Sequence, residues 1–239
     1  MAVRAAAAII LVVACGAMGI ACLDISLDLE DAPCSGDYRE GCLGAQHELD
    51  SVASASCDGV GRRFCLAPLG FVNASIMTQL VAHYREQYGL SVTVLTPGSV
   101  PGDLAPQRNG QFDAISLIEY MGSAFPDAYL DPEAVLIGVT PLDIYDQRSD
   151  FRFVFGVKGT AGDPKGVMST FRMNPETFGK DADLDVLLVR ARKFLSRYIG
   201  LLYYGLAQSP DPTSPLYDNI LSLRDVDRLG EPLPVSPAP

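Results

Sequence analysis

Hydrophobic residues along this chain fall into short continuous or β-branched runs that alternate with longer stretches at helical spacing. The short runs predict strands, which we expect at Arg62–Leu69, Leu90–Leu95, Ala134–Val139, Phe151–Lys158 and Gly166–Met173. The longer stretches predict helices, which we expect at Asn73–Tyr88, Phe112–Phe125, Ala182–Leu206 and Leu221–Leu229. This alternation of strands and helices indicates an α/β fold built on a layered sheet.

Three of these elements carry more specific signals. The run Ala134–Val139 contains no polar residue, so we expect a strand that is buried on both faces. Asn73 and Gly89 are favoured residue types for the start and the end of the helix between them. The helix Ala182–Leu206 is expected to end before the proline-rich loop Ser209–Pro215.

Residues 1–21 have the pattern of a secretory signal, with a short basic start, an apolar run and small residues at its end. Residues 19–22 (GIAC) are similar to a bacterial lipobox, although Gly19 replaces the usual leucine, and this predicts acylation of Cys22. Several acyl chains together anchor a protein stably to a membrane. We therefore expect an exported protein that is lipid-anchored at the bacterial cell envelope, with plain secretion as the alternative.

Residues 22–61 form an acidic arm without sustained periodicity, which predicts a linker before a domain at residues 62–229. The cysteines that follow Cys22 are an even set, consisting of Cys34, Cys42, Cys57 and Cys65. In an oxidising compartment they predict two disulfides with three possible connectivities. Their spacing is too wide for a zinc knuckle. Because Cys65 lies on the first expected strand, at least one bridge should tie the arm to the sheet.

The chain has a formal charge of −11 at pH 7, and many of its acidic residues lie in the arm. This balance and the lack of a basic stripe argue against a nucleic-acid partner. The last segment, Gly230–Pro239, contains four prolines and no apolar period, so we expect a disordered tail.

Several ordered segments between Arg63 and Leu229 carry a family resemblance. They are CLAPLG (Cys65–Gly70), NGQFDAISLIEYM (Asn109–Met121), the segment Val135–Pro175, and NILSLRDVD (Asn219–Asp227). Together they resemble the archaemetzincin family of zinc-dependent proteases. The resemblance implies a metzincin-like twisted mixed sheet with packed helices and one long active-site helix. It also implies a catalytic zinc and a second zinc held by four cysteines.

The positions that should hold the catalytic metal carry other residues. Metzincins place H-E-x-x-H-x-x-G-x-x-H on this helix and a methionine turn after it. Aligning the motif glycine with Gly205 puts the histidine positions at Tyr198, Leu202 and Gln208, and the glutamate position at Ile199. The methionine position is assigned to Leu221. The chain has only two histidines, both far upstream, and no cysteine after Cys65.

These replacements remove the chemistry of zinc hydrolysis, which needs lone-pair ligands and a carboxylate to take a proton from water. The long helix instead has an apolar stripe at helical spacing, formed by Leu187, Ala191, Phe194, Leu195, Tyr198, Leu202 and Gly205. We therefore expect a degenerate helix packed as core, with no metal and no cofactor, in a protein that is not an enzyme.

The resemblance also implies a substrate cleft, which does not depend on the metal ligands. In metzincins the strand that borders this cleft pairs with an extended substrate. The resemblance places this edge at Gly166–Met173, with Val167, Ser169 and Phe171 as the candidate peptide-binding residues. The leading hypothesis is a pseudoprotease that binds an extended peptide or an envelope protein by strand addition. The alternatives are a zinc-dependent metallopeptidase with a non-standard site and a structural envelope lipoprotein whose arm spaces the domain from the membrane.

Overall fold

The computed structural model describes residues 53–98, 100, 104–160 and 162–235. The described residues contain a five-stranded sheet in the order β2-β1-β4-β7-β6. Its strands are β1 (Arg63–Pro68), β2 (Val92–Val94), β4 (Ala134–Thr140), β6 (Gly156–Lys158) and β7 (Lys165–Ser169). All neighbours are parallel except β6, which runs antiparallel to β7. A separate parallel pair joins β3 (Phe112–Asp113) to β5 (Ile144–Tyr145).

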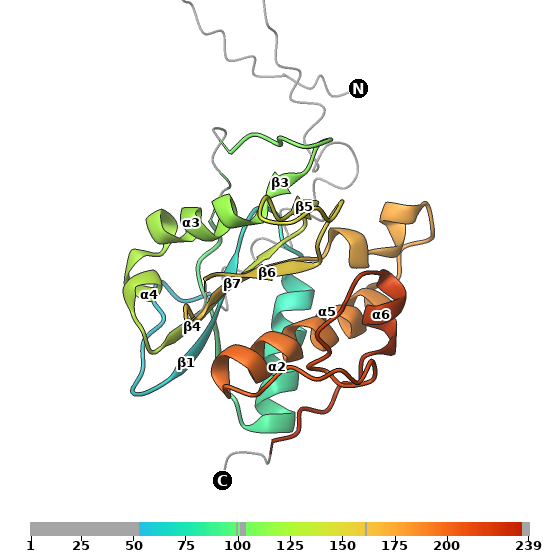
Figure 1. The fold of residues 1–239 in the computed structure, drawn as a ribbon. Coiled ribbons are helices and arrows are strands. Elements are labelled where there is room, and N and C mark those ends of the chain that lie inside the picture. The colour runs from blue at the N-terminus through green and yellow to red at the C-terminus, as the bar shows by residue number, and fades with distance from the viewer. Residues whose placement is uncertain (1–52, 99, 101–103, 161, 236–239) are drawn as a thin grey trace, which may run out of the picture. The chain divides into compact units, whose positions relative to one another are not determined.

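Helices cover both faces of this sheet (Figure 1). They are α2 (Ala74–Tyr88), α3 (Ala114–Ala124), α4 (Pro126–Leu130), α5 (Leu184–Tyr198) and α6 (Leu223–Arg228). Two 3₁₀ turns, η2 (Phe171–Met173) and η3 (Pro175–Phe178), precede α5, and the π-helical turn η4 (Ile199–Tyr203) continues it. The α/β architecture with a mixed sheet is therefore as expected.

Alternating side chains of each strand supply two separate cores. In β1, Phe64 and Leu66 pack with α2 and α5, whereas Cys65 and Ala67 pack with α3. This alternation is the period of two of a pleated strand. Strand β4 is buried at all seven positions because it lies in the middle of the sheet with helices on both faces. The prediction for Ala134–Val139 is confirmed.

The ends of α2 are also as predicted. The Asn73 side chain accepts hydrogen bonds from the backbone N–H groups of Ser75 and Ile76, which have no partner inside the first turn. Gly89 has a φ of 63° and its N–H donates to the carbonyls of the last turn. The caps therefore fix where this helix begins and ends.

Three predicted elements are shorter than expected. Helix α3 begins at Ala114 because the Asp113 side chain caps it by accepting from Ser116 N at 2.8 Å. The expected strand Phe151–Lys158 is reduced to β6, since Val154 bonds to Ile144 instead. The expected strand Gly166–Met173 ends at Ser169, after which residues 171–173 form η2.

The prediction of a disordered tail is wrong for residues 230–235. Leu233 is 5% exposed, and its N–H donates to the Tyr88 hydroxyl at 3.1 Å. Glu231 forms an ion pair with Arg192 of α5. The segment is fixed by these contacts because proline does not prevent an irregular chain from packing.

Several predictions fall outside the described residues: the signal over residues 1–21, acylation of Cys22, most of the arm, Cys34 and Cys42, and residues 236–239. Within the part of the chain that is described, no helix is both long and apolar enough to span a bilayer.

Candidate functional site

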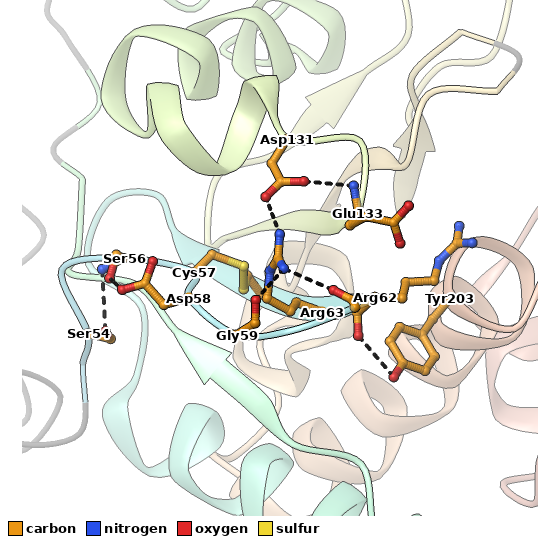
Figure 2. The surroundings of a disulfide bond; sticks show 12 residues. Ser54, Ser56, Cys57, Asp58, Gly59, Arg62, Arg63, Asp131, Glu133 and Tyr203 are labelled. Atoms are coloured by element: carbon orange, nitrogen blue, oxygen red, sulfur yellow. Dashed lines mark hydrogen bonds and ion pairs between the residues drawn. A yellow bond between two sulfur atoms is a disulfide. The ribbon is translucent and has the colours of Figure 1, made fainter.

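A disulfide joins the end of the acidic arm to the central sheet. Cys57 and Cys65 form this bridge with 6.0 Å between their Cα atoms (Figure 2). Arg63 closes the same loop by donating to the carbonyls of Gly59 and Gly61 and by pairing with the Asp131 carboxylate. The prediction that one bridge ties the arm to the first strand is confirmed.

The first histidine position of the motif is occupied by a buried tyrosine. Tyr198 is 2% exposed, and its hydroxyl donates to the Val167 carbonyl of β7 at 2.9 Å. Burial raises the pKa of Tyr198, so its hydroxyl remains a neutral donor at neutral pH. A Cβ atom on Gly156 would lie 2.5 Å from the Tyr198 hydroxyl, and one on Gly166 would lie 3.0 Å from its ring. The two glycines thus leave the space that the tyrosine fills.

The other motif positions differ in their exposure to solvent. Ile199 is fully buried, while Leu202 is half-buried against the core and its carbonyl accepts from Arg62. Gln208 is exposed. Gly205, aligned with the motif glycine, has a φ of 66°, the left-handed conformation that commonly ends a helix.

The residue that packs against the turn η4, at Gly200, is Leu216, which the sequence did not single out. Leu216 is 4% exposed and lies so close to Gly200 that a Cβ atom there would collide with it. Leu221 is 51% exposed. The assignment of the methionine-turn position to Leu221 stays a prediction, but this exposed side chain is not part of the core packed against Gly200.

The candidate peptide-binding strand, Gly166–Met173, does not lie at the edge of the sheet. Strand β7 pairs with β4 on one side and with β6 on the other, so Val167 and Ser169 are buried within the sheet. Phe171 lies beyond the strand in η2. The sheet ends at β6 instead, which the sequence could not reveal because strand order is a long-range property.

The backbone of β6 presents hydrogen-bonding groups on its free side. Phe155 and Gly159 bond to β7, accepting from Ser169 and donating to Lys165 respectively. In an antiparallel pair every second residue bonds to the partner, so Gly156 and Lys158 direct their N–H and C=O groups outward. The Lys158 carbonyl accepts from Arg148 at 3.2 Å. The Gly156 groups face the open edge.

A cleft of about 370 Å³ runs beside this edge. Its far wall comes from Phe194 and Arg197 of α5 and from the loop before α6, with Ile220 and Leu221 among its lining residues. Desolvation by burial, followed by the charge of Arg197, lowers the pKa of Lys158. The cleft therefore combines apolar walls, cations and an unpaired strand edge.

The described side chains do not fit a zinc centre. Among these residues no three His, Cys, Asp or Glu side chains lie together in a way that could hold a metal ion. His83, the one described histidine, lies on α2 in contact with Tyr84 and Tyr88. The residues at the aligned positions are a tyrosine bonded to the sheet, a leucine and an exposed glutamine, so no chemical step is assigned to a metal.

Comparison with known proteins finds relatives over most of the domain, although no family model matches. The chain is 29% identical to the archaemetzincin of Methanocaldococcus jannaschii over 138 residues, which is 58% of this chain and 70% of that protein. A zinc-dependent peptidase from Methanocorpusculum labreanum has a similar structure, with a TM-score of 0.57 and 23% identity over 70% of this chain and 94% of its own. The archaemetzincin of Archaeoglobus fulgidus, complexed with malonate, gives a TM-score of 0.53 and 25% identity over 70% and 92%.

These relatives correct one expectation and confirm another. The structure from M. labreanum is that of a zinc-dependent peptidase, and this finding contradicts the expectation that no cofactor is involved. The expected resemblance is confirmed by both sequence and structure. In sequence and in fold, this chain is archaemetzincin-like.

Proposed function

We propose that this archaemetzincin-like domain binds extended peptides along β6 and does not cleave them by the glutamate-assisted route of H-E-x-x-H proteases. The observation that carries the proposal is the free antiparallel edge of β6 beside the cleft. An extended peptide can add to such an edge through backbone hydrogen bonds, while neighbouring pockets select its side chains. The N–H and C=O groups of Gly156 and the N–H group of Lys158 would supply the hydrogen bonds, since the Lys158 carbonyl already accepts from Arg148.

The cleft has the size and chemistry of a site for peptide side chains. Its volume of about 370 Å³ lies within the usual range for ligand pockets. Phe194, Ile220 and Leu221 provide apolar surface, and Arg197 and Asp218 provide charge. This mixture suits a chain with alternating apolar and polar side chains.

The absence of proteolysis is inferred from Ile199. In H-E-x-x-H proteases a carboxylate takes the proton of the attacking water. Ile199 occupies the aligned position, its side chain is a hydrocarbon, and it is fully buried. It can neither accept a proton nor reach a substrate in the cleft.

We extend the proposal to location and partner. The Cys57–Cys65 disulfide supports an oxidising compartment, as is typical of exported proteins. Together with the signal pattern and Cys22, it favours a lipid-anchored protein at the cell envelope whose ligand is a peptide or a segment of another envelope protein. Labelling with a radioactive fatty acid tests the anchor: wild type should be labelled, and Cys22→Ser should not.

N-methylated peptides test strand addition directly. A peptide that pairs with β6 directs every second N–H toward the strand, so methylating residues of that parity removes the pairing. Binding should be lost for this set and kept for the same peptide methylated at the other residues. Equal binding of the two sets would show that the peptide is not held as an added strand.

Two exposed leucines provide a matched pair of variants for the cleft. Leu221 lines the cleft and is 51% exposed, whereas Leu130 is 80% exposed at the end of α4 and does not line it. Leu221→Asp should weaken peptide binding about tenfold, because about 1.4 kcal/mol of apolar burial is lost. Leu130→Asp should bind like wild type. If both variants bind equally well, the ligand does not occupy the cleft.

The competing function is a zinc-dependent peptidase with a non-standard site, which the relative from M. labreanum favours. To distinguish the two functions, peptides are incubated with the protein in the presence and absence of added zinc, and mass spectrometry then shows whether they have been cleaved. We expect intact peptides in both samples. Cleavage that requires zinc and disappears with a chelator would establish the peptidase and refute the proposal.

A further inference from the structure

A second cavity beside the cleft is lined by three arginines, and we call it the arginine pocket. It has a volume of about 490 Å³. Arg108 comes from the loop before β3, Arg152 from the segment before β6, and Arg172 from η2. Asp143 also lines it, so the side chains carry three positive charges against one negative charge.

The single carboxylate is already fully engaged. Arg172 binds Asp143 through two hydrogen bonds, from Nε to Oδ1 at 2.8 Å and from Nη2 to Oδ2 at 2.7 Å. Gln111 donates to the same Oδ2 at 3.1 Å. Such a bidentate pair is geometrically specific, and it holds the Arg172 guanidinium 4.1 Å above the Phe153 ring. Asp143 therefore leaves the other two guanidinium groups uncompensated.

Arg108 and Arg152 retain free donors. Among the described residues, the Arg108 guanidinium makes one hydrogen bond, to the Phe151 carbonyl at 3.2 Å, and it lies over the Tyr145 ring. Arg152 is exposed and makes no hydrogen bond or ion pair to another described residue. A site with two excess positive charges stands out in a chain with a net charge of −11. Guanidinium groups in this arrangement bind carboxylates well.

The arginine pocket is continuous with the proposed peptide site. Phe153 lines both the cleft and the arginine pocket. The chain bends at Phe155, and Val154 pairs with Ile144 of β5, so a peptide paired with Gly156 leaves the strand edge at that point. Its path into the arginine pocket then runs past Phe153. Because Arg152 precedes Gly156 by four residues, it lies at most about 13 Å further along, which an extended peptide spans in about four residues.

We propose that the arginine pocket receives a carboxylate of the peptide bound at β6, so that the ligand is an acidic peptide. This inference rests on the proposed function. The carboxylate comes either from an Asp or Glu side chain or from the C-terminus of the peptide. An unmodified peptide carries no other anionic group at neutral pH, so the excess charge of Arg108 and Arg152 selects among peptides by carboxylate position.

The test compares fluorescently labelled peptides of one sequence by polarisation. One carries Glu at the position expected to reach the pocket, a second carries Gln there, and each is made with a free and an amidated C-terminus. The protein variants are Arg152→Gln and Arg108→Gln, and Arg85→Gln, an exposed arginine on α2, is the control. Arg172 is left unchanged because its pair with Asp143 is part of the fold.

We expect wild type to bind the carboxylate-bearing peptide at least tenfold more tightly than its neutral counterpart. Arg152→Gln and Arg108→Gln should abolish that preference and leave binding of the neutral peptide unchanged, while Arg85→Gln should keep it. If amidation of the peptide C-terminus removes the preference for the carboxylate-bearing peptide, the bound carboxylate is the C-terminus. If the preference remains after amidation, the bound carboxylate is the Glu side chain.

Two results would overturn this inference, and they differ from a failure of the proposed function. The first result is equal binding of neutral and acidic peptides, and the second is stronger competition by inorganic phosphate than by acetate. Either would show that the arginine pocket does not select carboxylates, but the proposal that peptides bind at β6 would remain valid. If none of the peptides binds wild type, strand addition at β6 is itself refuted.

Discussion

Tyr198 provides a quantitative test of whether the degenerate helix is packed as core. Its hydroxyl crosses from α5 to β7 and donates to the Val167 carbonyl at 2.9 Å. Its ring contacts Phe194 edge to face, with 5.6 Å between centroids. We predict that Tyr198→Phe is mildly destabilising and that Tyr198→Ala is severely destabilising, because the first variant removes one hydrogen bond and the second also removes the ring.

The magnitudes follow from the partners that remain. Val167 lies opposite Val157 in a hydrogen-bonded position of the antiparallel pair, so its carbonyl keeps a ladder hydrogen bond when the tyrosine hydroxyl is lost. Tyr198→Phe should therefore cost the net value of one hydrogen bond, about 1 kcal/mol. Tyr198→Ala should cost about 4 kcal/mol, the usual range for removing a buried aromatic ring.

Urea and thermal unfolding measure both values. A domain of this size loses roughly 2–4 °C in Tm per kcal/mol, so we expect a decrease of about 3 °C for Tyr198→Phe and about 12 °C for Tyr198→Ala. Tyr204→Phe is the control, since its hydroxyl makes no hydrogen bond within the described part of the chain, and it should change stability by less than about 0.5 kcal/mol. If Tyr198→Ala costs less than about 1 kcal/mol, the core assignment of this helix face is refuted.

Three further predictions test the edge, the C-terminal segment and the one described histidine. Gly156→Ala should cost about 1–3 kcal/mol in urea unfolding, because its Cβ would lie 2.6 Å from the Val167 carbonyl, which the sheet holds in place; an unchanged midpoint would contradict this packing. Leu233→Ala should cost about 2–4 kcal/mol by the same measurement, whereas a disordered tail would give no change. Burial, followed by the charge of Arg192, lowers the pKa of His83 below 6.5. Just below pH 6.5 the unfolded chain therefore binds more protons than the folded chain, so the free energy of unfolding should decrease as the pH falls through this window. Unfolding curves at pH 7.5 and 5.5 measure this decrease, which should be smaller for His83→Gln than for wild type.

Local signals in the sequence were sufficient for several elements. Asn73 and Gly89 act within one helical turn, so their residue types alone predict the caps of α2. The apolar run of β4 predicts a central strand because only a strand covered on both faces can bury every residue. Cys65 on the first strand predicts a bridge to the arm, although the choice of Cys57 as its partner required the structure.

Long-range features were beyond the sequence. The apolar composition of residues 166–173 is compatible with either an edge or an interior strand, and only the pairing with β6 distinguishes the two. Leu216 lies beneath the helix because the loop after η4 folds back under it, a path without a local signature. The arginine pocket draws on Arg108, Arg152 and Arg172, which come from three separate segments. Periodicity describes one element at a time, so it does not bring such residues together.

The packing of the aligned motif positions and the free edge of β6 are physically independent. Tyr198 and Ile199 stabilise the interface between α5 and the sheet, where a histidine or glutamate would be buried without the partners a polar group needs. The outward groups of Gly156 and Lys158 depend only on the pairing of β6 with β7. Core residues at the aligned positions can therefore stabilise the wall of the cleft without closing its edge. The proposed absence of cleavage is thus compatible with the proposed binding of an extended peptide at β6.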